Sequence, residues 1–262
     1  MQNEQCCAII LAAGDGKRMK ASCPKAMCNV LFKPMISWVA DSCIAFGAEK
    51  ACVITGDGGE QIEKILPKNF ITVKQYERKG TGHAVMMAKE FIRDNKQNDF
   101  IVLCADAPFV DSEIIKESYE LHKSSNSMVT LITAELENPF GYGRIVRDGD
   151  EVKAIAEQKD ANPEQLQIKE INSGSYWFKG EFLLEALELL TCNNAGGEYY
   201  LTDAVFHAVN QGKKVTAYKC RDNKAVLGAN DRKGLLKLNE IATQKVLDLL
   251  MDMGVNFYCT DG

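Results

Sequence analysis

The first side chains that could do chemistry are cations in a glycine-rich loop near the amino terminus. Gly14 and Gly16 follow an apolar run, residues 9–13, and allow the backbone to turn tightly and approach a ligand closely. The charged residues of this loop are Asp15, Lys17, Arg18, Lys20 and Lys25. A cationic loop at the end of a strand suits a polyanion, and we expect a nucleoside triphosphate. The glycines alone, or the charges alone, would instead indicate a solvated turn.

Two well-known phosphate-binding motifs do not fit this loop. A P-loop requires the spacing GxxxxGK[ST], which does not occur around Gly14 or Gly16. A dinucleotide-binding fingerprint requires a third glycine where this chain has Met19. The loop therefore belongs to another class of phosphate-binding loops.

A second candidate is the carboxylate of Asp106, which directly follows the apolar run 100–105. A carboxylate at the end of a strand, facing the same edge as the cationic loop, is well placed to hold Mg²⁺ against phosphates. Taken alone, Asp106 could simply start the turn before Pro108, because aspartate often initiates turns.

The segment QYERKGTGHA, residues 75–84, is the third candidate. Gly80 and Gly82 flank Thr81 just before an expected helix, so backbone groups are bared where a flat base could dock. The amide of Gln75 offers both a donor and an acceptor to such a base. We place His83 in the first turn of the helix rather than in a catalytic acid or base role.

The elements that position these residues alternate between strands and helices through the first half of the chain. Strands are expected at 9–13, 51–55, 71–75 and 100–105, and helices at 35–46, before Pro67, at 83–92 and at 112–124. This α/β alternation predicts a Rossmann-like, mainly parallel sheet with helices on both faces. Ligands bind beyond the carboxyl ends of such strands, so the loops after Ala13, Gln75 and Ala105 should gather at one edge.

The second half of the chain has a different character. Strand-like runs at 128–134, 143–147, 152–157 and 172–178 are separated by long polar connections, which indicates an inserted, more antiparallel subdomain. Residues 215–219 could return a strand to the sheet. From Asp231, a plausible N-cap, to about Met253 we expect one long helix that ends before Gly254. Its apolar residues (Leu235, Leu238, Ala242, Val246, Leu249 and Met253) form a single stripe, for its own domain or for a partner chain.

Composition narrows the function classes. A formal net charge of -5 argues against general nucleic-acid binding. The ten cysteines include no CxxC pair, and none of the three histidines has zinc-ligand spacing to a cysteine, so neither a disulfide framework nor a zinc site is expected. No apolar run approaches the length of a membrane span and the polar start MQNEQ has no basic region, so we expect a cytoplasmic protein.

The motif LAAGDGKRM, followed by Pro24 and Lys25, resembles the opening of the sugar-1-phosphate nucleotidyltransferases. The segments GTGHA, NPFGYGRI, AEQKDA, EINSG and NNAGGEYYLTD follow in order. Together they resemble the uridylyltransferase (pyrophosphorylase) domain of the bifunctional enzyme that makes UDP-N-acetylglucosamine, from about Ile9 to Met253. The resemblance implies a nucleotide-diphospho-sugar transferase fold. It comprises a nucleotidyltransferase domain (1–230, with a nucleotide part to about 127 and a sugar part from about 128), the long helix (231–254) and a tail (255–262).

The resemblance also implies a role for each matching residue. Arg18 and Lys25 would be catalytic and grip the triphosphate. The nucleotide would contact Leu11, Ala12, Ala13, Gly14, Gln75, Gly80 and Thr81. The sugar phosphate would contact Gly143, Glu157 and Asn172, and Mg²⁺ would be held by Asp106 and Asn230. Three positions depart from the family pattern, namely Asp15, Lys17 and Ala105.

The reaction implied joins UTP and N-acetylglucosamine-1-phosphate, for cell-wall precursor or other amino-sugar metabolism, and releases pyrophosphate. The sugar phosphate is already an anion, so its attack on the α-phosphorus needs no general base, only positioning and charge neutralisation. The alternatives are the same chemistry on another sugar phosphate or nucleotide, and a non-catalytic protein that senses sugar nucleotides. The bifunctional enzyme continues into a left-handed β-helix that carries an acetyltransferase and forms a trimer. This chain reaches Gly262 without such repeats, so neither that activity nor that trimer is expected, although another oligomer is possible.

Overall fold

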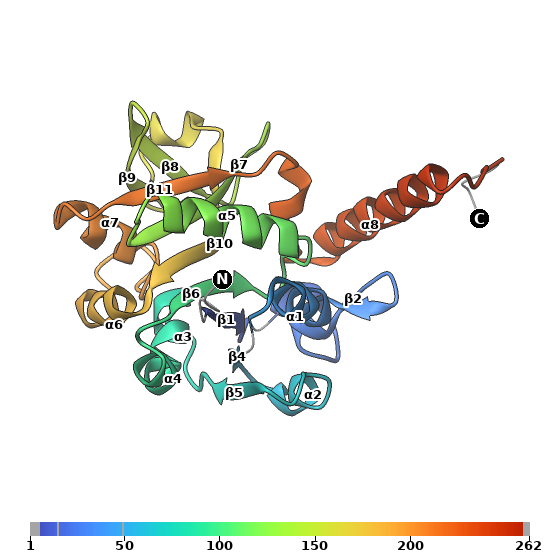
Figure 1. Cartoon of the computed structure of the whole chain (residues 1–262), viewed down its shortest axis with the longest axis horizontal. Coiled ribbons are helices and arrows are strands. Elements are labelled where there is room, and N and C mark those ends of the chain that lie inside the picture. Colours follow the sequence, from blue (N-terminus) through green and yellow to red (C-terminus); the bar gives the residue numbers. More distant parts are fainter. Residues whose placement is uncertain (1–5, 15, 49, 259–262) are drawn as a thin grey trace.

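The computed structural model describes residues 6–14, 16–48 and 50–258. Its centre is a mixed sheet in which the strands lie in the order β11-β7-β10-β6-β1-β4-β5, with β8 and β9 attached to β10 (Figure 1). The strands are β1 (Cys6–Ala12), β4 (Lys50–Thr55), β5 (Phe70–Lys74), β6 (Asp99–Cys104), β7 (Val129–Glu135), β8 (Gly143–Asp148), β9 (Glu151–Ala156), β10 (Glu170–Lys179) and β11 (Val215–Lys219). A separate short hairpin joins β2 (Asn29–Val30) to β3 (Lys33–Pro34).

The sheet has two parallel parts joined by one antiparallel strand. Strands β6, β1, β4 and β5 run parallel, as do β11 and β7, whereas β10 is antiparallel to both β6 and β7. Strands β8 and β9 form an antiparallel extension on β10. The fold class predicted from the sequence is therefore confirmed, including the antiparallel insertion and the return of residues 215–219 to the sheet.

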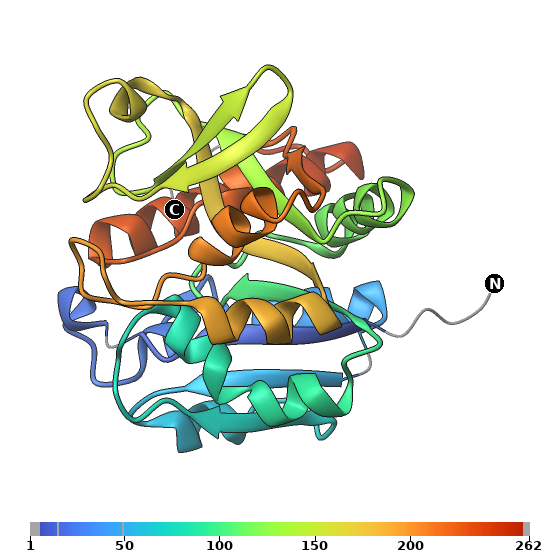
Figure 2. The ribbon, with the colours of Figure 1, turned by 90° about the vertical axis from the view of Figure 1, so that its left-hand side faces the viewer.

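Helices cover both faces of the sheet because successive side chains of β1 point to opposite sides. Ala8 and Ile10 pack in the same core as α1 (Met35–Phe46), α2 (Gly59–Glu63) and α5 (Ser112–Ser124). Cys7 and Ile9 pack with the helices of the other face, α3 (Thr81–Met87), α4 (Lys89–Asp94), α6 (Gly180–Leu189) and α7 (Asp203–Asn210). Figure 2 shows α6 lying across this second face.

Several boundaries differ from the sequence-based expectation. The segment expected to form one helix at 83–92 forms two, α3 and α4. They are separated at Ala88, whose N–H bonds to the carbonyl of Val85, three residues back, instead of four residues back as in an α-helix. Helices α6 and α7 and the β2–β3 hairpin were not predicted. The helix expected at 35–46 and that at 112–124 have the predicted bounds.

The long carboxy-terminal helix, α8 (Arg232–Asp252), is capped as predicted: the Asp231 carboxylate accepts from the N–H of Gly234. Its apolar stripe is buried only in its first half, where Leu238 and Ala242 contact the core around Val30. The second half projects away from the sheet, and the side chain of Leu249 is 59% exposed (Figure 1). Of the two partners considered for the apolar stripe, the chain's own core therefore covers only the first half of α8.

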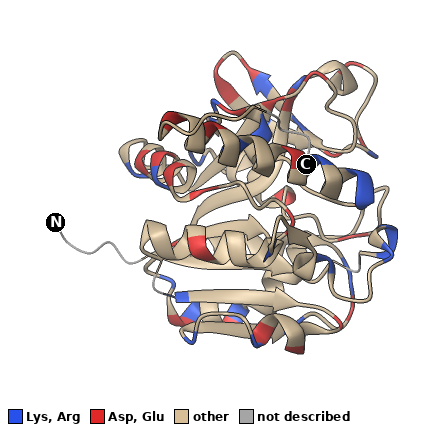
Figure 3. Cartoon of the chain, turned by 90° about the vertical axis from the view of Figure 1, so that its right-hand side faces the viewer, with Lys and Arg blue, Asp and Glu red and all other residues tan. Residues whose placement is uncertain are grey.

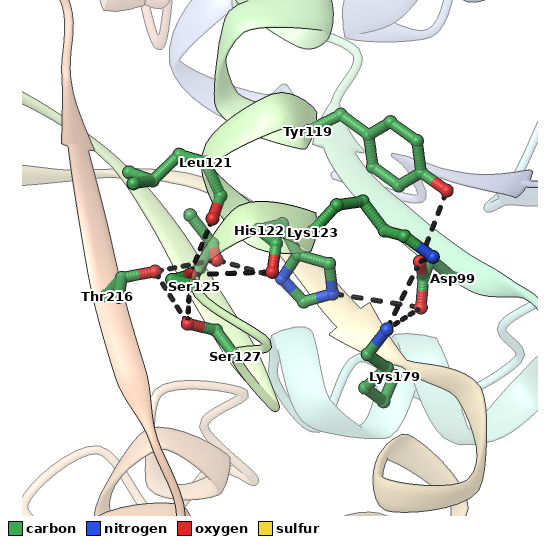
Figure 4. A network of polar contacts seen from close by, with 10 residues as sticks. Asp99, Tyr119, Leu121, His122, Lys123, Ser125, Ser127, Lys179 and Thr216 are labelled. Atoms are coloured by element: carbon green, nitrogen blue, oxygen red, sulfur yellow. Dashed lines mark hydrogen bonds and ion pairs between the residues drawn. The ribbon is translucent and has the colours of Figure 1, made fainter.

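A buried polar cluster joins the two parts of the sheet at the edge opposite the carboxyl end of β6 (Figure 4). Asp99, at the start of β6, is 5% exposed, and its carboxylate lies 3.1 Å from the Lys179 ammonium at the end of β10. The hydroxyl of Tyr119 on α5 donates to the same carboxylate at 3.2 Å. His122 Nε2 lies 3.8 Å from it, while His122 Nδ1 contacts the Thr130 hydroxyl at 2.8 Å.

The surface carries both signs of charge. In Figure 3 the ribbon segments of basic and acidic residues are interspersed over the side that faces the viewer. Within the described ranges no helix is long and apolar enough to cross a membrane. The nine cysteines that the structure describes all carry free thiols; the tenth, Cys259, lies outside those residues.

Candidate active site

A pocket of about 530 Å³ opens at the carboxyl edge of the parallel strands. Its walls come from the ends of three strands and from the start of α3. The lining residues include Leu11, Ala12, Ala13, Gly14, Lys17, Lys25, Gln75, Arg78, Gly80, Thr81, Cys104, Ala105, Asp106 and Glu198. The loops after Ala13, Gln75 and Ala105 thus meet at one edge, as the strand pattern predicts.

The glycines of the first loop make room for the side chain of Lys25. A β-carbon added at Gly14 would lie 3.4 Å from Lys25 Cε, and one added at Gly16 only 2.9 Å from Lys25 Cβ. Gly16 also has a φ of 57°, in the left-handed region that favours glycine. The loop therefore needs a glycine at position 16 both for its turn and for the close passage of Lys25.

Three of the predicted residues converge beside the glycine loop; Lys25 and Asp106 line the pocket, and Asn230 lies next to them outside its lining. The Lys25 ammonium forms an ion pair with the Asp106 carboxylate and donates to the side-chain carbonyl of Asn230 at 3.1 Å. The N–H of Ala229 donates to the backbone carbonyl of Asp106 at 3.0 Å, which fixes the Asn230 segment beside β6. Side chains from two distant segments, Asp106 and Asn230, therefore meet at the Lys25 ammonium.

The same oxygens fit a magnesium ion. Carboxylate and amide oxygens are hard ligands of the kind that Mg²⁺ prefers, and the Lys25 ammonium already places a positive charge between them. The described residues contain no group of three or more His, Cys, Asp or Glu side chains that could hold a metal. A Mg²⁺ here would accordingly have Asp106 and Asn230 as protein ligands and would take its other oxygens from phosphates and water.

The segment around Gly80 is packed against a second motif, GGEYYLTD. Gly80 has a φ of 101°, and a β-carbon there would lie 2.5 Å from the backbone carbonyl of Tyr199. The N–H of Gly82 donates to this carbonyl at 2.8 Å, and the Thr81 hydroxyl accepts from the N–H of Leu201 at 3.1 Å. These contacts hold the start of α3 as a rigid wall of the pocket beside the buried Gln75.

The three residues predicted for sugar binding also lie together. Gly143 pairs with Asn172 across β8 and β10, and a β-carbon at Gly143 would lie 3.6 Å from Glu157 Oε2. The Asn172 amide donates to the Tyr176 hydroxyl at 2.6 Å, and Glu157 accepts from the Thr202 hydroxyl at 3.0 Å. Burial raises the pKa of Glu157 from its ordinary value, and neighbouring carboxylates raise it further.

This second cluster does not line the 530 Å³ pocket but adjoins it. The Cys104 thiol, which lines the pocket, donates to the carbonyl of Gly174 at 3.5 Å, two residues from Asn172. Burial raises the pKa of Cys104 to about 12, so this thiol stays neutral and acts as a small apolar wall. The two clusters are thus neighbouring parts of one edge.

The structure separates one predicted residue from the rest. Arg18 is exposed on the 3₁₀ turn η1 (Lys17–Met19) and is not among the residues that line the pocket, whereas Lys17 is. Of the three departures from the family pattern, Lys17 and Ala105 line the pocket, and Asp15 lies outside the described residues.

Arg78 is a pocket residue that the sequence-based reasoning missed. Its Nε donates to the Ala13 carbonyl at 3.2 Å, and its Nη2 donates to Asp57 at 3.0 Å. The arginine therefore links the loop after β1 to the turn after β4. The sequence did offer a signal for Arg78: it lies between Gln75 and Gly80, and a cation next to a segment expected to bind a base could reach the phosphates of the same nucleotide.

Known proteins give an independent comparison. Residues 7–242 match the nucleotidyl transferase family. The bifunctional protein GlmU of Fervidobacterium nodosum is 43% identical over 94% of this chain and 53% of its own length. The bifunctional protein GlmU of Clostridioides difficile is 42% identical over 97% of this chain and 55% of its own length. The chain thus spans about half the length of these relatives. In fold the chain is similar to a UDP-glucose pyrophosphorylase complexed with UDP-glucose, with a TM-score of 0.72 and 20% sequence identity. The match covers 92% of this chain and 99% of that structure.

Proposed function

The chain belongs to the nucleotidyl transferase family, and from this premise we propose that it transfers a uridylyl group from UTP to N-acetylglucosamine-1-phosphate. The products are UDP-N-acetylglucosamine and pyrophosphate. The GlmU relatives and the ordered segments from GTGHA to NNAGGEYYLTD support this choice of substrates.

The observation that carries the proposal is the convergence of Lys25, Asp106 and Asn230 beside the glycine loop. Nucleotidyl transfer brings two anions together and moves negative charge onto the leaving pyrophosphate. A fixed ammonium group and two oxygen ligands for a divalent cation meet that need, because they neutralise charge where it develops. A protein that only binds a sugar nucleotide has no need of this arrangement.

Each part of the site has a role in this reaction. Lys25 holds the triphosphate and neutralises charge around the α-phosphorus, and the exposed Arg18 would have to swing inward to assist. Mg²⁺, held by Asp106 and Asn230, would shield the phosphate oxygens from one another. Gln75, the start of α3 and the loop 11–14 bind the base and ribose.

The cluster of Gly143, Glu157 and Asn172 binds the amino sugar. The side chains of Glu157 and Asn172 offer acceptors and donors to hydroxyl and acetamido groups. The absence of a side chain at Gly143 lets Asn172 and Glu157 lie close to this strand, which keeps the two polar groups together. The phosphate of the sugar then lies on the side of Lys25 and can attack the α-phosphorus in line. No general base is required, because the attacking oxygen is already charged.

A pyrophosphate-release assay tests the proposal. We expect release with UTP, N-acetylglucosamine-1-phosphate and Mg²⁺ together, and none when either substrate or the metal is omitted. Faster release with glucose-1-phosphate or another nucleotide would move the substrate assignment within the same chemistry. Binding of UTP and the sugar phosphate without any pyrophosphate would contradict the proposal and favour a regulatory protein.

A further inference from the structure

The Gln75 side chain is held in one orientation by two neighbours. Its Nε2 lies 3.2 Å from the backbone carbonyl of Gly80 and 3.0 Å from Nδ1 of His83. A carbonyl oxygen can only accept a hydrogen bond, so the amide nitrogen of Gln75, and not its oxygen, must face Gly80. The direction of the amide is thereby determined.

This direction also determines the state of His83. The Gln75 amide group has two hydrogens, and the Gly80 carbonyl takes one of them. Nδ1 of His83 therefore accepts the other, which requires the tautomer that carries its hydrogen on Nε2. The His83 ring is itself flanked by the Tyr199 ring, with centroids 6.2 Å apart and planes tilted by 33°.

With both hydrogens engaged, Gln75 offers the pocket only an acceptor. The side chain is 5% exposed, and the residue lines the nucleotide pocket. Its remaining polar atom, Oε1, has no hydrogen-bond partner within the described part of the chain and is not fully buried. A base that docks against Gln75 therefore meets a carbonyl oxygen.

We propose that His83 is a positioning residue that sets base specificity by holding Gln75 as a pure acceptor. Uracil carries a hydrogen on N3 and can donate it to Oε1, whereas N3 of cytosine is an acceptor and would be repelled. Leaving such a polar pair unmade in a closed site discriminates strongly between ligands. This inference rests on the proposed function, because it concerns the base of the nucleotide that the same site would use.

Substitutions at His83 separate this role from simple packing. In His83→Asn the side-chain oxygen can take the place of Nδ1, so the acceptor is kept. In His83→Leu the acceptor is lost, and in His83→Gln it is moved away from Gln75 by one further bond. The kcat/KM values are measured with UTP, CTP and 5-methyluridine triphosphate, which also has a hydrogen on N3.

We expect the preference for UTP over CTP to fall on the order of tenfold in His83→Leu and His83→Gln, mainly through KM, and to change little in His83→Asn. The ratio of UTP to 5-methyluridine triphosphate should stay constant in all three variants. Wild-type preference for UTP over CTP in both His83→Leu and His83→Gln would overturn the inference. If His83→Leu does not fold, His83→Gln decides.

A failure of the proposed function would look different. In that case the wild-type protein would release no pyrophosphate from any triphosphate. Calorimetric binding of UTP and CTP to the wild type and to His83→Gln would then still test the role of His83. Equal UTP:CTP affinity ratios in the two proteins would overturn it, and a lower ratio in the variant would support it.

Discussion

Arg78 acts on the shape of the pocket through the backbone of Ala13, to which it donates a hydrogen bond. Its hydrogen bond to the Ala13 carbonyl and its ion pair with Asp57 hold the loop after β1 in place. About a third of its side chain is exposed, so a phosphate group could also compete for the guanidinium. In either case we propose that Arg78 contributes to nucleotide binding rather than to the chemical step.

Replacement of Arg78 by alanine should therefore raise the KM for UTP roughly three- to tenfold and leave kcat nearly unchanged, since a binding interaction is lost equally from ground and transition states. Steady-state kinetics with saturating sugar phosphate measure this split. Lys79→Ala is the matched control, because it removes the same charge from a side chain that pairs with Glu77 outside the nucleotide pocket. A fall in kcat without a change in KM would contradict the assignment.

The positions of single residues could be predicted best where the residue directly follows a strand. Asp106 could be placed at the carboxyl edge because the apolar run before it fixes a buried strand, and the structure has it there. The exposure of Arg18 and the inward position of Lys17 could not be predicted, because both lie in one short turn and only the local backbone decides which side chain faces the pocket.

The loop between β1 and the 3₁₀ turn η2 (Lys25–Met27) is the element that the site depends on most. Its turn requires a left-handed residue at Gly16, and its far end brings Lys25 back across the same glycine. The loop thus couples backbone conformation to the position of the Lys25 ammonium, which we propose to be catalytic.

Gly16→Ala should lower both stability and kcat. The left-handed conformation costs an ordinary residue about 1–2 kcal/mol, and the new methyl group would also displace Lys25. Gly149→Ala is a close control, because Gly149 has a φ of 58° and nothing within 4 Å of the added carbon. Thermal unfolding should show a decrease in both variants, whereas turnover should fall only in Gly16→Ala. Equal activity in the two variants would show that Lys25 is not displaced.

The bounds of most helices and strands could be predicted from the sequence to within a residue or two, because the period of the apolar residues shows which side of an element is buried. The sequence-based prediction missed α6 and α7, because no element was assigned to the residues between 178 and 215. It also left open what covers the apolar stripe of α8, because periodicity shows that a helix is amphipathic but not what packs against each turn. Leu238 is buried and Leu249 is exposed, although both lie on the same predicted stripe.

The whole molecule depends on a junction between its two parallel sets of strands. The Asp99 cluster spans this junction, since it ties β6 to β10 and α5 at the edge opposite the pocket (Figure 4). Burial acts to raise the pKa of Asp99, but the interactions with His122 and Lys179 outweigh it and hold the pKa at about 2.

A lowered carboxyl pKa makes stability depend on pH in a definite direction. The folded pKa of about 2 lies below the ordinary value of 3.8, so the stabilisation is complete above about pH 4 and is lost as the pH falls to 2. Its size is roughly 2 kcal/mol. Urea unfolding between pH 2 and 6 should show this loss in the wild type and a weaker dependence in Asp99→Asn. The same pH dependence in both proteins would contradict the role of Asp99.

The overall architecture could be predicted because alternating strands and helices leave few arrangements open. What the sequence could not provide is the meeting of Lys25, Asp106 and Asn230, which are brought together by three separate loops. Only the family resemblance suggested Asn230, since no local pattern around it indicates a ligand. That convergence is the central claim, because the proposed chemistry requires the three side chains to act as one centre.

The most direct test is a double-mutant cycle on the rate of pyrophosphate release, with Lys25→Ala, Asp106→Asn and the double variant. Each single substitution should lower kcat on the order of 10² to 10³, and the exposed Lys68→Ala should have no effect. If the two residues form one centre, the double variant should be within about tenfold of the slower single variant. Near wild-type rates in either single variant, or losses that simply multiply, would contradict the account.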